Sequence, residues 1–480
     1  MKKIYSANSF KNADMRYDGI KLMEKAAKGI LSALVPNIKG GNLTILCGVG
    51  NNGGDGWAVA CFLEYENVTV IYTGEPKTKE ALFYKNKYKG KSIHIDEKES
   101  FEKIRASETI LDCIFGIGLE RAAVGIYEKI FSAVNESRAF VVSADVPSGI
   151  SADESKDFPH INADLTVCIT DIKLSALHSA TKNAYGKITV ADIGVDMSNE
   201  LPFAFLCDDE LLSFLPKRIE NSNKGTFGTL KTLCGSYNMT GAGILAINGA
   251  LRSGVGLVKA FGDEKVLEIY KNRLTEPVFK SYSKNAFIAE KASCALIGCG
   301  IGKVYNDDLE EIFENLLCPL VIDADGINFL SQNINVLERL TKVNENVILT
   351  PHPAEMARLT GKTVFEVQEN RLSLCKETSL KYNCTVVLKG SGTIICTPNE
   401  TPIINTTGNS GLAKGGSGDV LAGIIAALVT QGTLPHYASA IGVYLHGLCG
   451  DRLKEKLSEF SYLPSDIPTE LGKLLCEKLK

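Results

Sequence analysis

The sequence predicts two α/β domains, and three observations support this prediction. The chain has 480 residues, and at about 100–200 residues per domain this length fits two or three domains. Short apolar runs alternate with stretches of helical periodicity, a pattern typical of parallel sheets covered by helices on both faces. Several glycine-rich segments follow such runs, at the strand ends where open α/β sheets bind ligands. The expected domains are residues 1–205 and 206–480.

The composition narrows the class of protein. The net charge is −4, so a general basic surface for nucleic acid is not expected. The sequence begins with two lysines but no apolar run behind them, and no run approaches the ~20 apolar residues of a membrane span. The 14 cysteines form no C-x-x-C pair and do not cluster with histidines. We therefore expect a cytoplasmic protein with reduced, buried cysteines and no zinc site.

The first domain is expected to begin with helices and a strand. Residues 10–35 place apolar groups at helical spacing, which predicts one or two amphipathic helices. The run Leu43–Cys47 predicts a strand, residues 48–56 a glycine loop and residues 57–63 the helix that follows. This order opens a βαβ unit. Further strands are expected at residues 68–72, 109–112, 139–144 and 165–169, a domain end near 188–195 and a linker within 196–220.

A second α/β module is expected from residue 225 onward. Its strands are expected at residues 230–234, 295–298, 320–323, 347–350 and 385–388. The two halves of the chain do not repeat each other in sequence. In both halves several candidate functional residues follow expected strands, at the edge of an α/β sheet where ligands bind.

The segment after the first strand is rich in glycine and reads Asn51, Asn52, Gly53, Gly54, Asp55, Gly56. Glycines allow the backbone to approach a ligand closely, and amides at a helix N-terminus favour an anionic group such as a pyrophosphate. The spacing is not G-x-G-x-x-G, so it is not the dinucleotide fingerprint. A tight structural turn is the alternative, although two asparagines and an aspartate among the glycines are unusual for a turn.

Asp112 and Asp145 each stand at the end of an expected strand. If these strand ends are neighbours, oxygen atoms of Asn52, Asp112 and Ser148 could converge on a hard cation. The residue types do not choose the ion. Asp145 would then be free to act as an acid or a base. Taken alone, each aspartate is also typical of a loop cap or a turn.

A glycine segment also precedes a long apolar helix in the second half: Gly415, Gly416, Ser417, Gly418 and Asp419. Glycine amides that open a helix form an anion hole. An aspartate beside them would repel phosphate, so we expect it to take a proton from a hydroxyl during phosphoryl transfer. The alternative is an aspartate in the first turn that stabilises the helix dipole.

Three other strand ends in this half carry polar groups. Residues 389–393 (Lys-Gly-Ser-Gly-Thr) suit a nucleotide phosphate or a plain β-hairpin turn. His352 lies between two prolines that fix its position, although a lone histidine is more often structural. Asp323, Asp325 and Asn328 could orient Mg²⁺ or a hydroxyl, or cap the following helix.

The N-terminal motifs resemble the signature of the NAD(P)H-hydrate epimerase family over about residues 8–196, including the segments 22–26 and 184–194. The resemblance implies a Rossmann-like parallel-sheet domain that interconverts the R and S forms of NAD(P)H hydrated at ring carbon six. The hydrate-binding residues that it implies are Asn51, Asn52, Gly53, Gly54, Asp55, Gly116, Ile117, Gly118, Leu119, Glu120, Arg121, Ala122 and Asp145.

The same resemblance implies a metal and a proton-transfer group. Asn52, Asp112 and Ser148 would hold a potassium ion, and Asp145 would transfer the proton. The family also places a lysine near the pocket, at Lys173 here. The segment 174–178 after it departs from the usual glycine- and leucine-rich version.

The C-terminal motifs resemble the ADP/ATP-dependent NAD(P)H-hydrate dehydratases, an α/β family within the ribokinase-like superfamily, over about residues 220–475. The resemblance implies that Asp419 assists attack of the ring hydroxyl on the terminal phosphoryl of Mg²⁺-bound ADP or ATP. Loss of phosphate then restores the dihydronicotinamide of the S form. Cys299 departs from the proline that the family usually has there. The implied hydrate contacts are Ala242, Gly302, His352 and Asp419, and the implied nucleotide contacts are Lys389, Gly390, Ser391, Gly392, Thr393 and Gly418.

One alternative is a ribokinase-like kinase for a small alcohol with a non-catalytic N-terminal binding or dimerisation domain. A stable phosphorylated product, without NADH formed from its hydrate, would favour it. The sequence leaves open the choice between ADP and ATP and between NADH and NADPH hydrates. The expected partners are these small molecules and further copies of the chain in a homo-oligomer, with no nucleic acid and no membrane.

Overall fold

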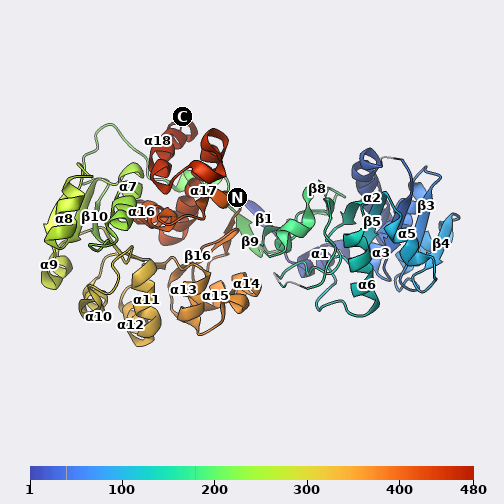
Figure 1. The fold of residues 1–480 in the computed structure, drawn as a ribbon, viewed down its shortest axis with the longest axis horizontal. Helices are drawn as coiled ribbons and strands as arrows, with labels where there is room; N and C mark the ends of the chain where they lie inside the picture. Colours follow the sequence, from blue (N-terminus) through green and yellow to red (C-terminus); the bar gives the residue numbers. More distant parts are fainter. Residues whose placement is uncertain (39, 155, 157, 179, 480) are drawn as a thin grey trace. The chain divides into compact units, whose positions relative to one another are not determined.

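The chain folds into two compact units in the computed structural model, which describes residues 1–38, 40–154, 156, 158–178 and 180–479. One unit, the N-terminal unit, is Ile4–Phe203; the other, the C-terminal unit, combines Met1–Lys3 with Ala204–Lys480. Each unit is a sheet flanked by helices (Figure 1). The first three residues thus belong to the C-terminal unit, which the sequence did not indicate, because their strand pairs with β9 (Ala204–Leu206).

The N-terminal unit is built on a seven-stranded sheet of order β4-β3-β2-β5-β6-β7-β8. Every neighbouring pair is parallel, as predicted. The strands are β2 (Leu43–Cys47), β3 (Val68–Tyr72), β4 (Lys91–His94), β5 (Thr109–Cys113), β6 (Phe140–Ala144), β7 (Leu165–Ile169) and β8 (Lys187–Ala191). The helices are α1 (Ala7–Asp14), α2 (Gly19–Leu34), α3 (Asn51–Phe62), α4 (Lys79–Lys87), α5 (Ser100–Arg105) and α6 (Ile126–Glu136).

The start of α3 corrects the prediction of a glycine loop over residues 48–56. The helix begins at Asn51, six residues earlier than expected. The glycines are required by packing, because a Cβ at Gly53 would overlap the carbonyl oxygen of Gly48. A Cβ at Gly56 would lie 2.8 Å from Cys47 Sγ, on the strand beneath the helix. Helix propensity, which disfavours glycine, is therefore overridden by the close approach of α3 to the sheet.

The C-terminal unit is built on an eleven-stranded sheet of order β1-β9-β18-β17-β16-β15-β14-β13-β10-β11-β12. Its centre is parallel, whereas β17 is antiparallel to both of its neighbours. Besides β9 the strands are β1 (Lys2–Ile4), β10 (Thr229–Leu233), β11 (Leu257–Gly262), β12 (Val278–Ser281), β13 (Cys294–Ile297), β14 (Leu320–Ile322), β15 (Val347–Leu349), β16 (Thr385–Leu388), β17 (Thr393–Cys396) and β18 (Ile403–Asn405).

Part of the expected linker is instead structured. Within residues 196–220, β9 pairs with β18, and a 3-10 helix, η4 (Asp209–Phe214), packs against α17. No pattern in the sequence signals β9, because the strand is only three residues long. The segment is therefore an integral part of the C-terminal unit rather than a free connection.

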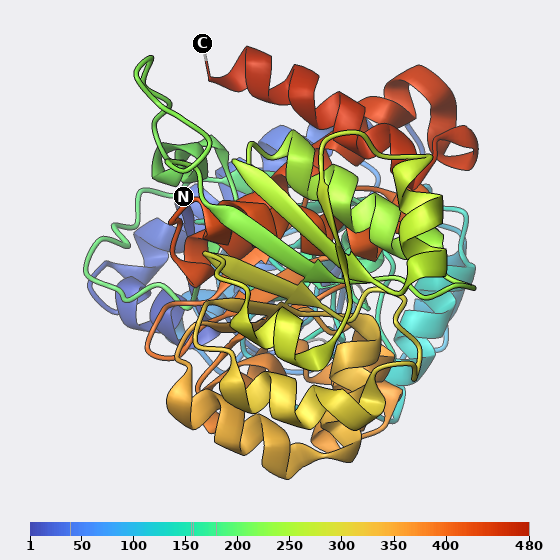
Figure 2. The same ribbon diagram turned by 90° about the vertical axis from the view of Figure 1, so that its left-hand side faces the viewer.

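Helices lie on both sides of this sheet; Figure 2 shows the red helices on one side and the yellow-to-orange helices on the other. The buried helix α16 packs against α7, where a Cβ at Gly423 would overlap the carbonyl oxygen of Ala246. The helices are α7 (Thr240–Arg252), α8 (Glu264–Lys271), α9 (Lys284–Ala289), α10 (Asn306–Asn315), α11 (Ala324–Gln332), α12 (Ile334–Val343), α13 (Pro353–Thr360), α14 (Val364–Glu369), α15 (Arg371–Lys381), α16 (Ser417–Thr430), α17 (Pro435–Ser461) and α18 (Ile467–Lys478).

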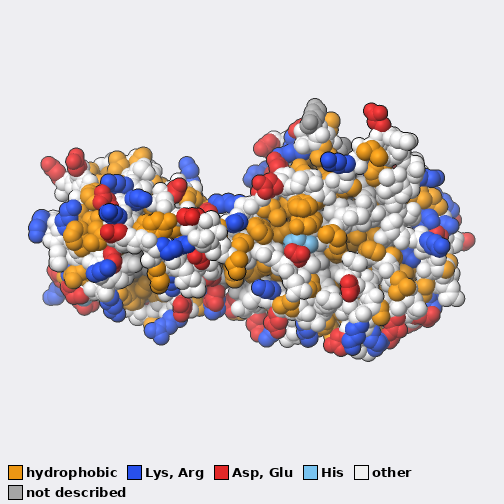
Figure 3. Space-filling model, turned by 180° about the vertical axis from the view of Figure 1, so that it is seen from behind, with side chains coloured by type: hydrophobic (Ala, Val, Ile, Leu, Met, Phe, Trp, Pro, Cys, Tyr) orange, Lys and Arg blue, Asp and Glu red, His pale blue; other side chains and the backbone are white. Residues whose placement is uncertain are grey.

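The state of the cysteines and the distribution of surface charge agree with the expectations from composition. All 14 cysteines are free, and most are buried. Basic and acidic side chains are interspersed on the face shown in Figure 3. Among the described helices, none has the length and apolar character to cross a bilayer.

Candidate functional site

The candidate residues of the N-terminal unit meet at the point where the strand order of its sheet reverses, between β2 and β5. The strand order places β5 directly beside β2, with Cys47 opposite Cys113 at the carboxyl ends. The chain leaves these two strands toward opposite sides, and such a switch point forms a crevice for ligands. The N-terminus of α3 and the loops after β5 and β6 surround this position.

Asp112, Ser148 and Asn52 form the floor of this site. Asp112 is fully buried; its Oδ1 accepts from Ser148 Oγ at 2.5 Å and its Oδ2 from the Ser148 amide at 2.9 Å. Burial raises the pKa of Asp112, and the hydrogen bonds from Ser148 oppose this shift. Asn52 is buried, and neither its Oδ1 nor its Nδ2 has a partner among the described residues. An unpaired buried amide costs free energy unless a ligand satisfies it.

Asp145 pairs with Lys173, a residue whose role the sequence left open. Lys173 Nζ lies 2.6 Å from Asp145 Oδ1, and both side chains are buried. Lys173 also donates to the carbonyl oxygen of Ile169 at 2.5 Å. Asp145 has a φ of 67°, a backbone conformation that non-glycine residues rarely adopt and that clusters at functional sites. The pair is thus held rigidly at the end of β6.

The loop after β5 contributes unevenly. Gly116 lies against Asn52, since a Cβ at Gly116 would be 3.3 Å from Asn52 Oδ1. Ile117, Leu119 and Ala122 are partly buried, whereas the backbone turns Gly118, Glu120 and Arg121 outward to solvent. In the described part of the chain, the structure therefore brings only the start of this loop to the Asn52–Asp112 floor.

Asp55 adds a third buried carboxyl to the site, after Asp112 and Asp145. It lies in the second turn of α3 and is 8% exposed. Burial, followed by the negative charges of Asp145 and Asp14, raises the pKa of Asp55 well above its ordinary value. The N-terminal site therefore favours the neutral form of Asp55, which can donate a hydrogen bond.

The C-terminal site forms at the start of α16. Gly416, with a φ of 100°, turns the chain into the helix, so that the first amides point outward. Among the described residues, the amides of Gly418 and Asp419 have no acceptor. Such amides together with the helix dipole bind an anion. Burial, and next the charge of Asp323, raises the pKa of Asp419 to about 6.

Lys389 lies beside these amides. A Cβ at Gly418 would be 3.3 Å from Lys389 Nζ, and that ammonium pairs with the buried Asp323 at 2.6 Å. Burial opposes the charge of Lys389, but the carboxylates of Asp323 and Glu355 outweigh it and raise the pKa of Lys389. The ligand atoms of Cys299, Asp323 and Asp419 lie within 4.8 Å of one another, a convergence that their spacing in the sequence did not indicate.

The loop of residues 389–393 is the turn of a β-hairpin, because β16 and β17 pair in antiparallel fashion on either side of it. The hairpin interpretation of the sequence was therefore right about the backbone. Gly390 and Gly392 both have positive φ, and Thr393 Oγ1 donates to the Gly390 carbonyl at 2.9 Å. The turn places Lys389 toward Gly418, so a hairpin does not exclude a phosphate site.

The other candidates surround the same sheet edge. His352 caps α13 by accepting from the Ala354 amide through Nδ1 at 3.1 Å. Burial, and next the charge of Lys389, lowers the pKa of His352. Ala242 and the loop that ends at Gly302 meet, because a Cβ at Gly300 would lie 2.6 Å from Ala242 Cβ. Asp325 accepts from the Gly302 amide at 2.8 Å, which corrects the idea that it only caps a helix.

Two buried residues that support the C-terminal site were not predicted. Arg371 is 1% exposed, and its guanidinium donates to the carbonyl oxygens of Leu388, Lys389 and Gly392 at 3.2–3.3 Å. His446 lies 3.3 Å from Ser417 Oγ, and burial lowers its pKa to about 4. Neither belongs to a glycine motif, so only a chain-wide search for polar residues in apolar surroundings could have found them.

Comparisons with known proteins cover both halves. Residues 19–175 match a family described as YjeF-related protein N-terminus, and residues 230–473 match a family described as NAD(P)H-hydrate dehydratase. A bifunctional NAD(P)H-hydrate repair enzyme from Moorella thermoacetica is 32% identical over 93% of this chain and 91% of its own length. An ADP-dependent (S)-NAD(P)H-hydrate dehydratase from Neisseria meningitidis is 38% identical over 50% of this chain and 81% of its own length.

A solved structure is similar to the C-terminal unit. The ADP/ATP-dependent NAD(P)H-hydrate dehydratase from Bacillus subtilis, co-crystallised with ATP and Mg²⁺, has a TM-score of 0.51 and 30% sequence identity to this chain. The match covers 57% of this chain and 99% of that chain. The ribokinase-like fold expected for this half is therefore confirmed.

Proposed function

Because the chain belongs to the family of bifunctional NAD(P)H-hydrate repair enzymes, we propose that its two units carry the two repair activities. The N-terminal unit would interconvert the R and S hydrates of NADH and NADPH. The C-terminal unit would dehydrate the S form with ADP or ATP. The proposed boundary lies at residues 205/206, close to the division between the compact units.

The observation that carries the proposal is the carboxyl of Asp419 beside two free amides and Lys389. Hydroxide leaves poorly from the ring, whereas phosphate leaves readily. Asp419 would take the hydroxyl proton while the oxygen attacks the terminal phosphorus and the bond to the nucleotide breaks. Phosphate would then leave with the C–O electron pair, and loss of a ring proton restores the dihydronicotinamide. The amides and Lys389 would stabilise the negative charge of the transferring group.

The nucleotide would lie over the hairpin turn. We assign Lys389, Gly390, Ser391, Gly392, Thr393 and Gly418 to it, and Ala242, Gly302, His352 and Asp419 to the hydrate. The proximity of Lys389 to Gly418 supports the first set, and the packing of Ala242 against Gly300 supports the second. Mg²⁺ would bind as a complex with the nucleotide phosphates, since its usual ligands are phosphate oxygens and water rather than a full set of protein side chains.

Potassium would fit the floor of the N-terminal site. Asn52 Oδ1 is buried and has no partner among the described residues, and Gly116 lies against it. The preceding amide, of Phe115, donates to Ser148 Oγ, which in turn donates to Asp112 Oδ1. A monovalent cation would satisfy the amide and neutralise the buried carboxylate of Asp112. Asp145, paired with Lys173, would hold or move the substrate proton, next to the hydrate-binding residues from Asn51 to Asp55 and from Gly116 to Ala122.

Two further expectations belong to the proposal. Free cysteines throughout the chain support a cytoplasmic location, because reducing compartments keep thiols unpaired. The homo-oligomeric state is tested by the sedimentation mass of the purified protein. The alternative of a small-alcohol kinase predicts a stable phosphorylated product and leaves the Asp145–Lys173 pair without a purpose.

The test follows absorbance of the reduced nicotinamide during incubation with an R/S hydrate mixture, Mg²⁺ and ADP or ATP. The wild-type chain should convert the whole mixture. Asp419→Asn should abolish the signal. Asp145→Asn should convert the S fraction at normal speed and leave the R fraction to slow spontaneous epimerisation. Rapid and complete conversion by the Asp145 variant, or any conversion by the Asp419 variant, would contradict the assignment.

A further inference from the structure

A carboxyl outside every motif lies at the Asp145–Lys173 pair. Asp14 is the last residue of α1, and its side chain has no hydrogen bond or ion pair among the described residues. Phe10, one turn earlier on this helix, has its ring 4.3 Å from Lys173 Nζ. Residues four apart share a helix face. The face of α1 that carries Phe10 and Asp14 is therefore turned toward the buried pair.

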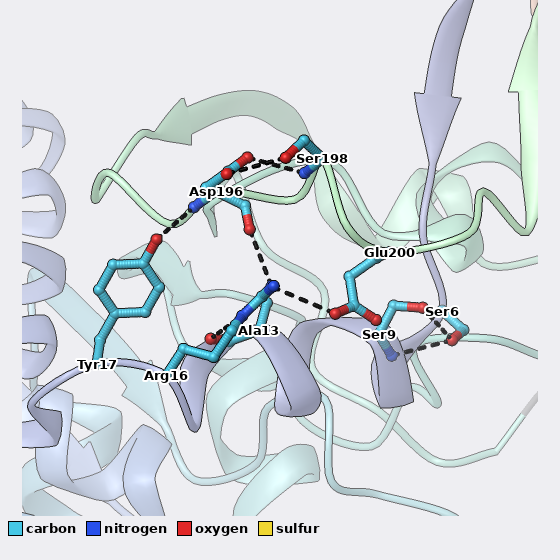
Figure 4. Close-up of polar contacts among 8 residues, drawn as sticks. All are labelled: Ser6, Ser9, Ala13, Arg16, Tyr17, Asp196, Ser198 and Glu200. Carbon is cyan, nitrogen blue, oxygen red and sulfur yellow. Dashed lines mark hydrogen bonds and ion pairs between the residues drawn. The ribbon is translucent and has the colours of Figure 1, made fainter.

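Helix α1 is held in this position at both ends. Ser6 caps its start by accepting from the Ser9 amide at 3.1 Å, as Figure 4 shows. After its end, Arg16 donates to the carbonyl oxygen of Asp196 at 3.0 Å and to Glu200 at 3.2 Å. Tyr17 Oη accepts from the Asp196 amide at 2.9 Å. A half-buried carboxylate without a partner costs stability, yet the fold fixes Asp14 firmly beside the pair.

Asp14 and Asp145 have different electrostatic surroundings. Three carboxyls face one another here, Asp14 from α1, Asp55 from α3 and Asp145 after β6, and Lys173 is the one cation among them in the described chain. Lys173 pairs with Asp145 directly. Burial, and next the charge of Asp145, raises the pKa of Asp14 to about 6. Two carboxyls with such different surroundings suit the separate roles of acid and base.

We propose that Asp14 is a second acid–base group of the N-terminal site and works opposite Asp145; this inference rests on the proposed epimerase function. Asp14 gives its proton to the ring hydroxyl as the C–O bond breaks, and the ring nitrogen supplies the electron pair that forms a C=N⁺ bond. A water molecule then adds to the other face of the ring carbon, and its proton passes to Asp145. The roles exchange in the reverse direction, and solvent restores both protonation states.

The experiment measures interconversion of separated R and S hydrates by the full chain without nucleotide, with the spontaneous rate subtracted. Asp14→Asn should slow it by about 100-fold or more, the usual contribution of an acid–base group, and Asp14→Glu should restore part of the rate. Glu24→Gln is the matched control, because it removes an exposed carboxylate from the same unit. Dehydration of purified S hydrate by each variant should stay within about twofold of wild type, since the two sites are independent.

A pH series separates an acid–base role from a structural one. Asp14 must be protonated in the direction in which it donates to the ring hydroxyl, so kcat/KM of the wild type in that direction should fall as the pH rises above about 6. Asp14→Asn should lose this limb. Epimerisation by Asp14→Asn within twofold of the Glu24→Gln control, or an unchanged limb, overturns the proposal. If Asp145→Asn also epimerises at the wild-type rate, the assignment of the epimerase function to this unit fails instead.

Discussion

At the scale of the residue, the ionisation of Asp419 should set the pH dependence of dehydration. Its pKa is raised to about 6, first by burial and then by the charge of Asp323. A base must be ionised, so kcat/KM for the S hydrate should fall about tenfold per pH unit as the pH drops below about 6. Initial rates of NADH formation between pH 5 and 8, with Mg²⁺ and nucleotide in excess, measure this profile.

A second titrating group makes a control necessary. Burial raises the pKa of Glu355 to about 7, and this residue lies near Lys389 and Asp323. Glu355→Gln removes that titration but keeps Asp419, so the acidic limb should remain near its wild-type position. A profile that is flat down to pH 5, or an acidic limb lost in Glu355→Gln, would show that Asp419 is not the base.

Single residues could be predicted from the sequence where a local pattern exposed them. Asp419 follows glycines that open an apolar helix, and Asp145 ends an apolar run shortly before Pro147, so both residues have a local signal. Asp14 and Arg371 have no such local signal. The helix of Asp14 lies against Lys173, more than a hundred residues away, and Arg371 contacts a hairpin that follows it in the chain. Such pairings are set by the topology of the sheet rather than by neighbours in sequence.

At the scale of the element, the hairpin between β16 and β17 should depend on Arg371. Burial lowers the pKa of Arg371 to about 10, and its guanidinium holds three carbonyl groups of the hairpin. In Arg371→Met these carbonyls lose their donor, at a cost of about 1–3 kcal/mol. If that cost falls on the ordered turn, KM for ADP or ATP should rise about 10- to 100-fold.

The split between two constants tests this role. KM for the nucleotide should change far more than KM for the hydrate, and Arg371→Lys should fall between the variant and the wild type. Arg339→Met is the matched control, because that arginine makes only exposed ion pairs with Glu310 and Glu314. Equal changes in both KM values, or a loss of activity that parallels a lower thermal unfolding temperature, would show that Arg371 serves only the general stability of the unit.

Elements were predicted well where apolar runs are continuous and poorly where packing overrides propensity. Each strand predicted from an apolar run is present, with its ends within one residue of the predicted ones. The strands β4, β11, β12, β17 and β18 were not predicted. The predicted helix at α3 was too short, because glycines disfavour isolated helices. In the structure Gly53 and Gly56 let the helix approach the sheet closely. The edge strand β1 and its neighbour β9 are each three residues long, too short to show the alternation that identifies a strand.

At the scale of the whole molecule, each candidate site is complete within one unit. Asp112, Asp145 and Lys173 lie in Ile4–Phe203, and Asp323, Lys389 and Asp419 lie in Ala204–Lys480. The sequence indicated this separation, because the two halves carry different motifs. The joining of Met1–Lys3 to the distant unit could not be predicted from local patterns.

This separation predicts complementation between variants. Asp145→Asn lacks the proposed proton-transfer group of the epimerase and Asp419→Asn lacks the proposed base of the dehydratase, but each variant keeps the other site. Because the hydrate is a freely diffusing small molecule, an equal mixture of the two proteins should convert a whole R/S mixture to NADH. The final absorbance should equal that of the wild type, at about half its rate for equal total protein, since half the chains carry each activity.

The control is each variant alone at the same total concentration. Asp145→Asn alone should stop near the S fraction on this timescale, and Asp419→Asn alone should give no signal. A mixture that stops where Asp145→Asn alone stops would mean that the hydrate does not leave the chain on which it was epimerised. Because each proposed site lies at the sheet edge of its own unit, we expect the S hydrate to pass from one chain to another through solvent.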